Sequence, residues 1–526
     1  MTVVLLVILM LSGLVCAAET KDTSVLVDVS NNLVYQAISD SKIGYNVPLG
    51  VPHLTGGDYN SPNLVKAMKK LPVTALRYPG GTVANFFEWN AETLDPDVIR
   101  KSRHKKMQHL IEKDFSRNKA LTHVDLDSFI KVTTDMGAKP FVVLNLYSSS
   151  INEIKKSIDK VKSKYKNSVF WELGNELSFK AYQSKYKNAH GWGAKVYKKI
   201  ASQVSVFINN KYPEDFIGIN ISEAASYRQP TPGNLKGVER ERFLWDNDIS
   251  EIAHYDAIIV HPYVYLNRKI ISQLNDVKLD DDPVLSGIDN NEKIWRWLFV
   301  SAEYLPVYYM DRIKKRFPGK KIWITETGIT GDRDVLHNSG AMYRLLFNAS
   351  YYISWMRYQQ DIVTYLYHGL FIGNSNNAVL YKDYSYTANG LAFKLIDAAF
   401  KGADSVAVPE VIAESDYLGT MNNTTYIVNA ISVLHTKSDA YKRTLIVNTG
   451  SKPIEIKRPF KVTCAVEYGG DPTMNIKNSK IYDLDDLPRL DITKDAIILK
   501  PYSISLLESS LINHKISHPA KCSWSS

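Results

Sequence analysis

The sequence predicts an α/β fold, a (β/α)8 TIM barrel followed by an accessory all-β sandwich domain. Between residues 40 and 400, eight short apolar runs alternate with helical stretches, as parallel strands with helical crossovers do. After Phe400 the pattern changes to short strand-like runs between polar turns, which favours a sandwich. The 526 residues, 45% hydrophobic and 23% charged, exclude a disordered or fibrous chain. An open doubly wound sheet is the alternative for the first region.

The expected barrel strands and helices follow one another along the chain. The strands are residues 42–46, 75–81, 140–146, 169–176, 217–221, 256–263, 321–328 and 361–370. The helices are residues 63–70, 125–136, 151–165, 192–210, 291–316, 342–358 and 389–399. The expected sandwich strands are residues 405–408, 417–421, 426–434, 443–448, 454–457, 460–468 and 497–507. The catalytic barrel therefore spans residues 40–400 and the sandwich residues 401–526.

Two segments precede the expected barrel. Residues 1–18 combine an apolar run with small residues before a cleavage point, which predicts a signal peptide and a secreted or lysosomal protein. A membrane anchor is the alternative, but the run is shorter than the ~20 residues of a spanning helix. Residues 24–37 predict a β-hairpin, and residues 19–39 are expected to add strands to the sandwich.

In a secreted protein, cysteines can form disulfides and sequons can be glycosylated. Cys16 leaves with the signal peptide, so Cys464 and Cys522 remain and are expected to form a disulfide. Two buried free thiols are the alternative. Glycosylation sequons occur at four positions. They are Asn220, Asn348, Asn422 and Asn423.

Polar residues end the expected barrel strands, where barrel enzymes place their chemistry. They are Arg77 on the second strand, Asn145 on the third, Asn175 and Glu176 on the fourth, His261 and Tyr263 on the sixth, Glu326 on the seventh and His368 on the eighth. Two carboxylates at one barrel mouth are what glycoside hydrolysis needs, one as acid/base and one as nucleophile. Motifs for zinc, dinucleotides or a phosphate-binding loop are missing from the sequence, so we expect no metal and no cofactor.

The two glutamates are expected to have different roles. Glu326 is the expected nucleophile, kept ionised by Arg77 and by a hydrogen bond from Tyr263. Glu176 is the expected acid/base, because an ionised neighbour favours its protonated form. Asn175 is expected to bind a sugar 2-hydroxyl, and the other polar strand ends to bind substrate. Glu172 lies four residues before Glu176 and is expected deep in the barrel.

At these residues the chain resembles retaining glycoside hydrolases of clan A. Residues 171–177 (WELGNEL) and 323–328 (WITETG) look like the acid/base and nucleophile motifs of the heparanase and β-glucuronidase family, family 79. Residues 76–81 (LRYPGG) are similar to a strand of the family 51 α-L-arabinofuranosidases. Both families append a β-sandwich. Thr325 stands where heparanases usually have glycine, and residues 261–265 (HPYVY) depart from their double-histidine pattern.

The charge of the chain suggests a substrate. The net charge of +9 and the basic residues 100–119 favour an acidic, uronic-acid-containing polysaccharide or glycosaminoglycan. The alternatives are neutral glycans, cleaved as by an α-L-arabinofuranosidase, β-xylosidase or β-glucanase, or carbohydrate binding without turnover. The expected partner is a polysaccharide or oligosaccharide, with no nucleic acid and no stable membrane insertion. Linkage, endo or exo action, pH optimum and oligomeric state stay open.

Overall fold

The structure is a computed structural model. It describes residues 25–27, 33–38, 41–47, 62–94, 96–101, 125–179, 182, 193–222, 238–266, 290–331, 341–370, 377–381, 383–409, 411, 417–421, 424–428, 430–456, 461–476, 480–492, 496–511 and 522–525. The expected signal peptide, most of the basic segment 100–119, and the sequons at Asn422 and Asn423 lie outside the described residues.

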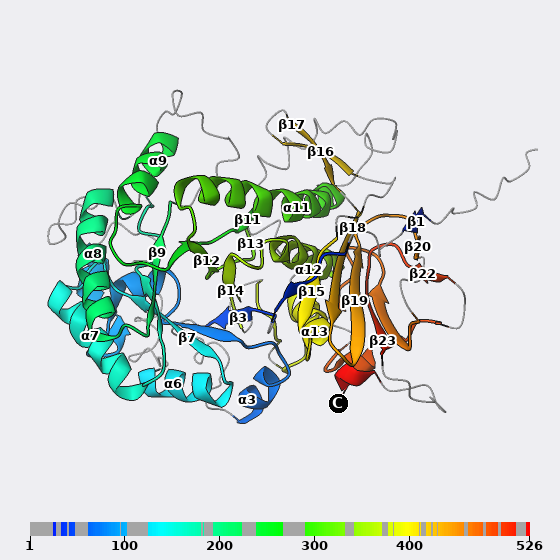
Figure 1. Cartoon of the computed structure of the whole chain (residues 1–526), viewed down its shortest axis with the longest axis horizontal. Coiled ribbons are helices and arrows are strands. Elements are labelled where there is room, and N and C mark those ends of the chain that lie inside the picture. Colours follow the sequence, from blue (N-terminus) through cyan, green and yellow to red (C-terminus); the bar gives the residue numbers. More distant parts are fainter. Residues whose placement is uncertain are drawn as a thin grey trace, which may run out of the picture.

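Eight parallel strands close into a barrel, which confirms the predicted fold class (Figure 1). In chain order they are β3 (Ile43–Asn46), β4 (Ala75–Tyr78), β7 (Lys139–Leu144), β8 (Phe170–Leu173), β9 (Phe216–Asn220), β10 (Ala257–Val260), β12 (Lys321–Ile324) and β14 (Ile362–Tyr367). Each strand pairs with the next, and β14 pairs in parallel with β3 to complete the ring. The doubly wound alternative is therefore wrong.

Helices surround the barrel. They are α3 (Pro62–Met68), α4 (Pro96–Lys101), α6 (Leu126–Asp135), α7 (Ile151–Lys164), α8 (Ala194–Lys211), α9 (Val238–Ile249), α11 (Asn290–Arg316), α12 (Met342–Met356) and α13 (Ala388–Phe400). α7 begins at a capping box between Ser150 and Glu153, which satisfies free backbone N–H groups of its first turn. The short α4 and the highly charged α9 are missing from the sequence prediction, because neither has a clear apolar stripe.

The sandwich is made of two sheets. The larger has the order β2-β15-β18-β19-β23-β21 and the smaller the order β1-β20-β22. The strands are β1 (Val25–Val27), β2 (Gln36–Ala37), β15 (Ser405–Ala407), β18 (Ile431–Lys437), β19 (Tyr441–Asn448), β20 (Ile454–Ile456), β21 (Cys464–Gly469), β22 (Ile497–Leu499) and β23 (Ser503–Ser510). Residues 24–37 do not form the expected hairpin, because β1 pairs with β20 and β2 with β15.

Short strand pairs complete the described structure. They are β5 (Phe87–Glu88) with β6 (Thr93–Leu94), β11 (Val264–Leu266) with β13 (Ile329–Gly331), and β16 (Tyr417–Met421) with β17 (Thr424–Val428). β11 and β13 follow barrel strands β10 and β12 and so extend the barrel mouth. The expected strand at residues 426–434 is divided between β17 and β18, and that at 497–507 between β22 and β23.

Barrel and sandwich share a continuous apolar core. α12 and α13 contact β18 and β19, and the barrel core cluster extends to Leu434 and Leu445 of the sandwich. Arg443 of β19 donates to the backbone oxygens of Ala398 at 2.8 Å and Lys401 at 2.6 Å, at the end of α13. These carbonyls terminate a helix and have no helical donors, so the arginine satisfies them.

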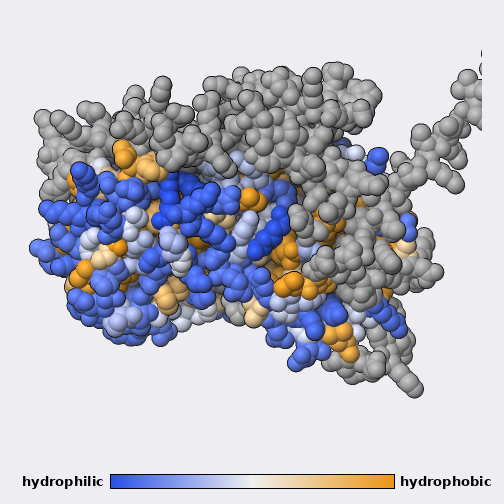
Figure 2. All heavy atoms as spheres, turned by 45° about the horizontal axis from the view of Figure 1, so that its top comes forward, coloured by the Kyte–Doolittle hydropathy of each residue, from blue (hydrophilic) through white to orange (hydrophobic). Residues whose placement is uncertain are grey.

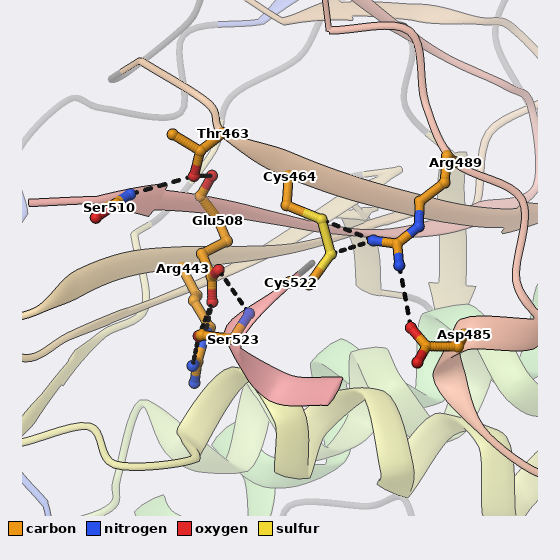
Figure 3. Close-up of a disulfide and its surroundings, with 9 residues drawn as sticks. All are labelled: Arg443, Thr463, Cys464, Asp485, Arg489, Glu508, Ser510, Cys522 and Ser523. Carbon is orange, nitrogen blue, oxygen red and sulfur yellow. Dashed lines mark hydrogen bonds and ion pairs between the residues drawn. A yellow bond between two sulfur atoms is a disulfide. The ribbon is translucent and has the colours of Figure 1, made fainter. Parts of the chain in front are cut away.

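The predicted disulfide between Cys464 and Cys522 is present (Figure 3). Arg489 donates to Cys464 at 2.7 Å and contacts Cys522, and it also pairs with Asp485 at 3.0 Å. Near the disulfide, Glu508 of β23 pairs with Arg443 and accepts from Ser523. The disulfide and these contacts hold the C-terminal residues 522–525 against the larger sheet.

Two of the four expected glycosylation sites are wrong. The side chain of Asn220 lies in β9 with 2% exposure, and Asn348 is fully buried in α12. Asn348 also donates to Asn389 at 2.7 Å. A glycan attached to either asparagine would have no room, because both side chains are buried. The prediction failed because sequon spacing carries no information about burial.

The outer surface of the barrel is mostly hydrophilic where Figure 2 shows described residues. Its apolar side chains lie inside, between strands and helices. Among the described residues, we find no helix with the length and apolar character to cross a bilayer.

Candidate active site

The interior of the barrel changes from apolar to polar along its strands. Ala75, Phe170 and Trp323 belong to an apolar cluster inside the barrel. Because strand side chains alternate with period two, the residues two positions further along these strands also point inward. These are Arg77, Glu172 and Thr325, all fully buried. The candidate site is built on this polar layer.

Arg77 connects the members of the layer. Its Nε and Nη2 donate to the two carboxylate oxygens of Glu172 at 2.8 and 2.9 Å. Its Nη1 donates to Asn46 Oδ1 at 2.8 Å and to Glu326 Oε1 at 2.6 Å, and its Nη2 also donates to Asn175 Oδ1 at 2.8 Å. Glu172 is therefore the deep ion-pair partner of this arginine, and its position below the mouth agrees with the expectation.

Glu326 lies just beyond β12 with 5% exposure. Tyr263 donates its hydroxyl to Oε2 at 2.8 Å. Burial alone would raise the pKa of Glu326, but His261, Arg77 and His368 together with the Tyr263 hydrogen bond outweigh burial and hold that pKa well below its ordinary value. Burial and the Glu326 charge raise the pKa of Tyr263, so its hydroxyl keeps its proton and donates.

Gly81 leaves space for the Glu326 carboxylate. A Cβ atom at position 81 would lie 2.8 Å from Glu326 Oε1. Any other residue would displace this carboxylate or the turn after β4. The second glycine of the LRYPGG motif is thus explained by the close approach of a side chain from another strand.

Glu176 follows β8 in an unusual backbone conformation. Its φ is 48°, in the left-handed region that residues with a side chain rarely adopt. Asn85 stabilises this turn, because its Oδ1 accepts from Asn175 N at 3.0 Å and its Nδ2 donates to Asn175 O at 2.7 Å. The strain at Glu176 is thus held by its neighbours, as is common at functional sites.

His261 lies between the two glutamates. Its Nδ1 is 3.0 Å from Glu176 Oε1 and its Nε2 is 3.0 Å from Thr325 Oγ1. A neutral imidazole has one donor and one acceptor nitrogen, whereas a hydroxyl group can donate or accept. Thr325 can therefore satisfy Nε2 in either tautomer. This contact allows His261 to accommodate both the protonated and the ionised form of Glu176.

Of the remaining predicted residues, Asn175 and His368 lie at the site, whereas Asn145 lies in its wall. Asn175 is fully buried, and its Nδ2 has no partner among the described residues, so it is free to bind a ligand. His368 Nδ1 lies 3.5 Å from Glu326 Oε2, and burial lowers the pKa of this histidine below its ordinary value. Asn145 instead binds Phe87 O at 3.1 Å and Ser148 Oγ at 2.7 Å. We therefore find Asn145 in the wall of the mouth, bound to loop residues.

A metal ion is a poor fit to this site. One carboxylate oxygen each of Glu176 and Glu326 and one ring nitrogen of His261 lie within 4.8 Å of one another, a spacing at which three ligands can surround an ion. However, Glu326 is already paired with Arg77, whose guanidinium would repel a cation. The arrangement suits proton transfer and nucleophilic attack by the two carboxyl groups.

Three supporting residues were missed by the sequence prediction. Asn46 donates to Thr325 O at 2.9 Å and accepts from Arg77. Asn85 holds the backbone at Asn175, and Thr325 binds His261. Asn46 ends the expected strand 42–46 and Thr325 lies within the expected strand 321–328, so strand alternation could have identified both. Asn85 lies in a short 3-10 helix, Thr82–Phe86, and only the folded structure places it here.

No family model matches the sequence, and neither does any curated protein. Solved structures do match. A family 51 α-L-arabinofuranosidase from Bifidobacterium longum is 14% identical, with a TM-score of 0.64 over 92% of this chain and 98% of that protein. A 4-O-α-L-rhamnosyl-β-D-glucuronidase from Fusarium oxysporum is 12% identical, with a TM-score of 0.54 over 93% and 97%. A family 44 endoglucanase from Clostridium acetobutylium is 12% identical, with a TM-score of 0.54 over 92% and 99%.

These similarities cover nearly the whole chain but lie at low identity, so they show a shared fold. The expected likeness to family 51 enzymes is confirmed at this level. The likeness to heparanases stays a prediction. The barrel with its sandwich is an architecture that this chain shares with glycoside hydrolases.

Proposed function

We propose that this protein is a retaining glycoside hydrolase in which Glu326 is the nucleophile and Glu176 the acid/base. One observation carries the proposal. Two carboxylates from different barrel strands face each other at the barrel mouth, with oxygens within 4.8 Å. This fits the carboxyl spacing of about 5–5.5 Å in retaining enzymes better than the roughly 6.5–9.5 Å that leaves room for water in inverting ones.

The environments of the two glutamates support these roles. Glu326 accepts from Arg77 and Tyr263, and both contacts favour its ionised form, which a nucleophile needs. The Glu176 side chain is 16% exposed and contacts His261. In the first step Glu326 attacks the anomeric carbon and Glu176 gives its proton to the leaving oxygen. In the second step Glu176 takes a proton from water, which attacks the same carbon and releases Glu326.

Asn175 supplies the contact expected for a sugar hydroxyl next to the reacting carbon. Its Oδ1 is fixed by Arg77, and its buried Nδ2 has no partner in the part of the chain that the structure describes. A buried donor without an acceptor is unfavourable, so a substrate hydroxyl that accepts from Nδ2 would be bound strongly. A hydrogen bond at this position strengthens in the transition state of many glycosidases.

We propose an acidic glycan as the first candidate substrate. The support is the net charge of +9 and the basic segment 100–119 after the second barrel strand. The Fusarium oxysporum enzyme that shares this fold is a glucuronidase by name. A neutral glycan is the alternative, since the other two structures carry the names of an arabinofuranosidase and an endoglucanase. Secretion is part of the proposal and rests on residues 1–18 and on the disulfide.

The test is hydrolysis of aryl glycosides and polysaccharides by the wild type and by Glu326→Gln and Glu176→Gln. The panel contains β-glucuronide, α-arabinofuranoside, β-glucoside and β-xyloside, then heparan sulfate, hyaluronan and neutral β-glucans. We expect at least one substrate to be cleaved with retention of anomeric configuration, and Glu326→Gln to abolish this cleavage. Glu251→Gln, a change at an exposed position, is the matched control. Hydrolysis that survives Glu326→Gln would contradict the proposal.

A further inference from the structure

A cavity of about 150 Å³ lies beside the candidate site, and no step of the proposed reaction uses it. It lies between the loop after β4, the loop after β7 and the first turns of α7. Its lining residues are Phe86, Glu88, Trp89, Asn90, Val98, Asn145, Ser148, Ser149, Glu153 and Ser157. Both loops follow barrel strands, so the cavity opens on the face of the barrel that carries Glu176 and Glu326.

A short chain of hydrogen bonds connects this cavity to the acid/base residue. Ser148, in the cavity wall, donates its hydroxyl to Asn85 O at 3.0 Å. Asn85 in turn holds the backbone of Asn175, which precedes Glu176. The cavity and the catalytic pair thus share one wall.

The cavity has the surface chemistry of a sugar site. Phe86 and Trp89 belong to its lining and are almost fully buried, so the cavity has aromatic rings in its wall. The Trp89 indole N–H has no acceptor among the described residues, although the residue is only 3% exposed. Glu88 and Asn90 are exposed at the rim and offer an acceptor and a donor. Aromatic faces beside a few placed hydrogen-bonding groups are typical of small-molecule sites.

The charges of the cavity indicate which sugar fits. Its described lining contains two carboxylates, Glu88 and Glu153, and neither lysine nor arginine. The nearby Lys160 binds Trp89 O at 2.8 Å, Asn90 O at 3.3 Å and the Glu92 carboxylate at 2.5 Å. These three contacts use the three donors of its ammonium group. A uronate or sulfate here would meet the like charge of Glu88 and Glu153, and the described lining offers no cation to balance it.

We propose that this cavity is a subsite for one uncharged sugar unit of the glycan, adjacent to the unit that is cleaved. The proposal rests on the proposed function. In an acidic polysaccharide the subsite takes the uncharged sugar that neighbours a uronic acid, and in a neutral glycan it takes the next sugar. Trp89 Nε1 donates to a hydroxyl of this unit, and the Glu88 carboxylate accepts from another. Because Lys160 fixes the loop, the subsite is formed before substrate arrives.

The experiment measures how much each added sugar unit increases kcat/KM. It uses the best aryl glycoside of the panel and neutral oligosaccharides of two to four units with the same terminal sugar. The variants are Glu88→Lys and, as a matched charge reversal outside the cavity lining, Glu251→Lys at an exposed position that pairs with Lys198. We expect Glu88→Lys to reduce the gain per added unit about threefold and to improve relative activity on uronate-containing oligosaccharides. An equal increase in kcat/KM per added sugar unit in Glu88→Lys and Glu251→Lys would overturn the proposed subsite.

A second variant tests the indole donor separately. Trp89→Phe keeps an aromatic ring but removes the N–H, and we expect it to reduce the gain on the neutral series about fivefold. An unchanged gain in a folded Trp89→Phe protein would overturn the role of Trp89. If the wild type cleaves nothing, the proposed function fails, and calorimetric binding of the neutral tetrasaccharide decides the subsite. Tetrasaccharide binding that is weakened by Glu88→Lys but not by Glu251→Lys would support the subsite. Equal affinity of the two variants, or no binding by the wild type, would overturn the subsite.

Discussion

The lower and upper halves of the barrel interior are made by the same strands but differ in chemistry. In the lower half, Phe141 stacks on Phe170 with ring centroids 4.7 Å apart and meets Trp323 edge-on at 5.0 Å. In the upper half, two residues further along these strands, Glu172 pairs with Arg77 and Thr325 binds His261. The strands of Phe170 and Trp323 thus each carry a packing residue and, two positions later, a polar residue that belongs to the site. Residues that stabilise the barrel and residues that form the site therefore lie only two positions apart along a strand.

This separation gives different expectations for substitutions in the two halves. Apolar contacts below should affect unfolding more than turnover. The ion-pair network above should affect both, because its charges are buried and also orient the nucleophile. Variants from each half therefore test whether the two layers have separate roles.

Arg77→Met should have the largest effect. It leaves the buried carboxylates of Glu172 and Glu326 without their cation, and we expect the free energy of unfolding to fall by about 3–5 kcal/mol. We expect kcat/KM to fall at least about 100-fold, because Glu326 loses a charged partner. Urea unfolding and kinetics on the best aryl glycoside measure the two losses.

A double variant sharpens this test. Arg77→Met with Glu172→Leu removes the ion pair as a unit, which is less damaging than removing one partner. We expect stability to recover in part while activity stays low, because Glu326 remains without its arginine. Recovery of activity would show that Arg77 acts through Glu172 and the fold alone.

Phe141→Ala should mainly affect the fold. The side chain is fully buried in the lower layer, and its loss should lower the free energy of unfolding by about 3–5 kcal/mol. We expect kcat of the folded fraction to stay within about threefold of the wild type, because distant sites act nearly independently. Comparing kcat with the urea midpoint separates the two effects. A large loss of kcat in fully folded protein would contradict separate layers.

Thr325→Val tests the hydroxyl beside His261. Valine has a similar shape but lacks the hydroxyl that contacts His261 Nε2. The loss of this hydrogen bond, about 1–2 kcal/mol, corresponds to roughly tenfold in kcat. We expect the pH profile of kcat to change as well, because one tautomer of His261 loses its support. Thr325→Ser should restore both the rate and the profile, and failure of serine to do so would assign the effect to packing.

Tyr263→Phe should have the smallest effect, a shift of the acid limb of the pH–rate profile. The pKa of Glu326 is held well below its ordinary value, so Glu326 stays ionised and the acid limb that it controls lies at lower pH than an ordinary glutamate would give. Tyr263→Phe removes a donor to the ionised form, which raises the pKa and moves the limb to higher pH. The stability that this group contributes is present above the unfolded pKa and decreases as pH falls. An acid limb that moves to lower pH would contradict the role of Tyr263.

Much of the fold could be predicted because parallel strands give continuous apolar runs between helices. Each barrel strand lies where its run predicts, including β8, which lies within the expected strand at residues 169–176. The prediction was wrong where pairing is not local. The segment 24–37 looks like a hairpin in sequence, yet β1 and β2 join different sheets with strands more than 300 residues away.

The site could be predicted in outline and not in detail. Strand ends converge at one mouth, so Glu176, Glu326 and Arg77 could be placed together from their strands alone. The interactions of Asn85 and Gly81 depend on how loops approach the site, and the sequence does not specify this. Burial of Asn220 and Asn348 is likewise a tertiary property that the sequon does not report.

Trapping the covalent intermediate tests the central claim most directly. An activated 2-fluoro glycoside of the best substrate slows release of the sugar, and mass spectrometry of peptides then identifies the labelled residue. We expect one sugar per protein, attached to Glu326, and no label in Glu326→Gln. Turnover with inversion, or a label on another residue, would contradict the assignment of Glu326 as the nucleophile of a retaining enzyme.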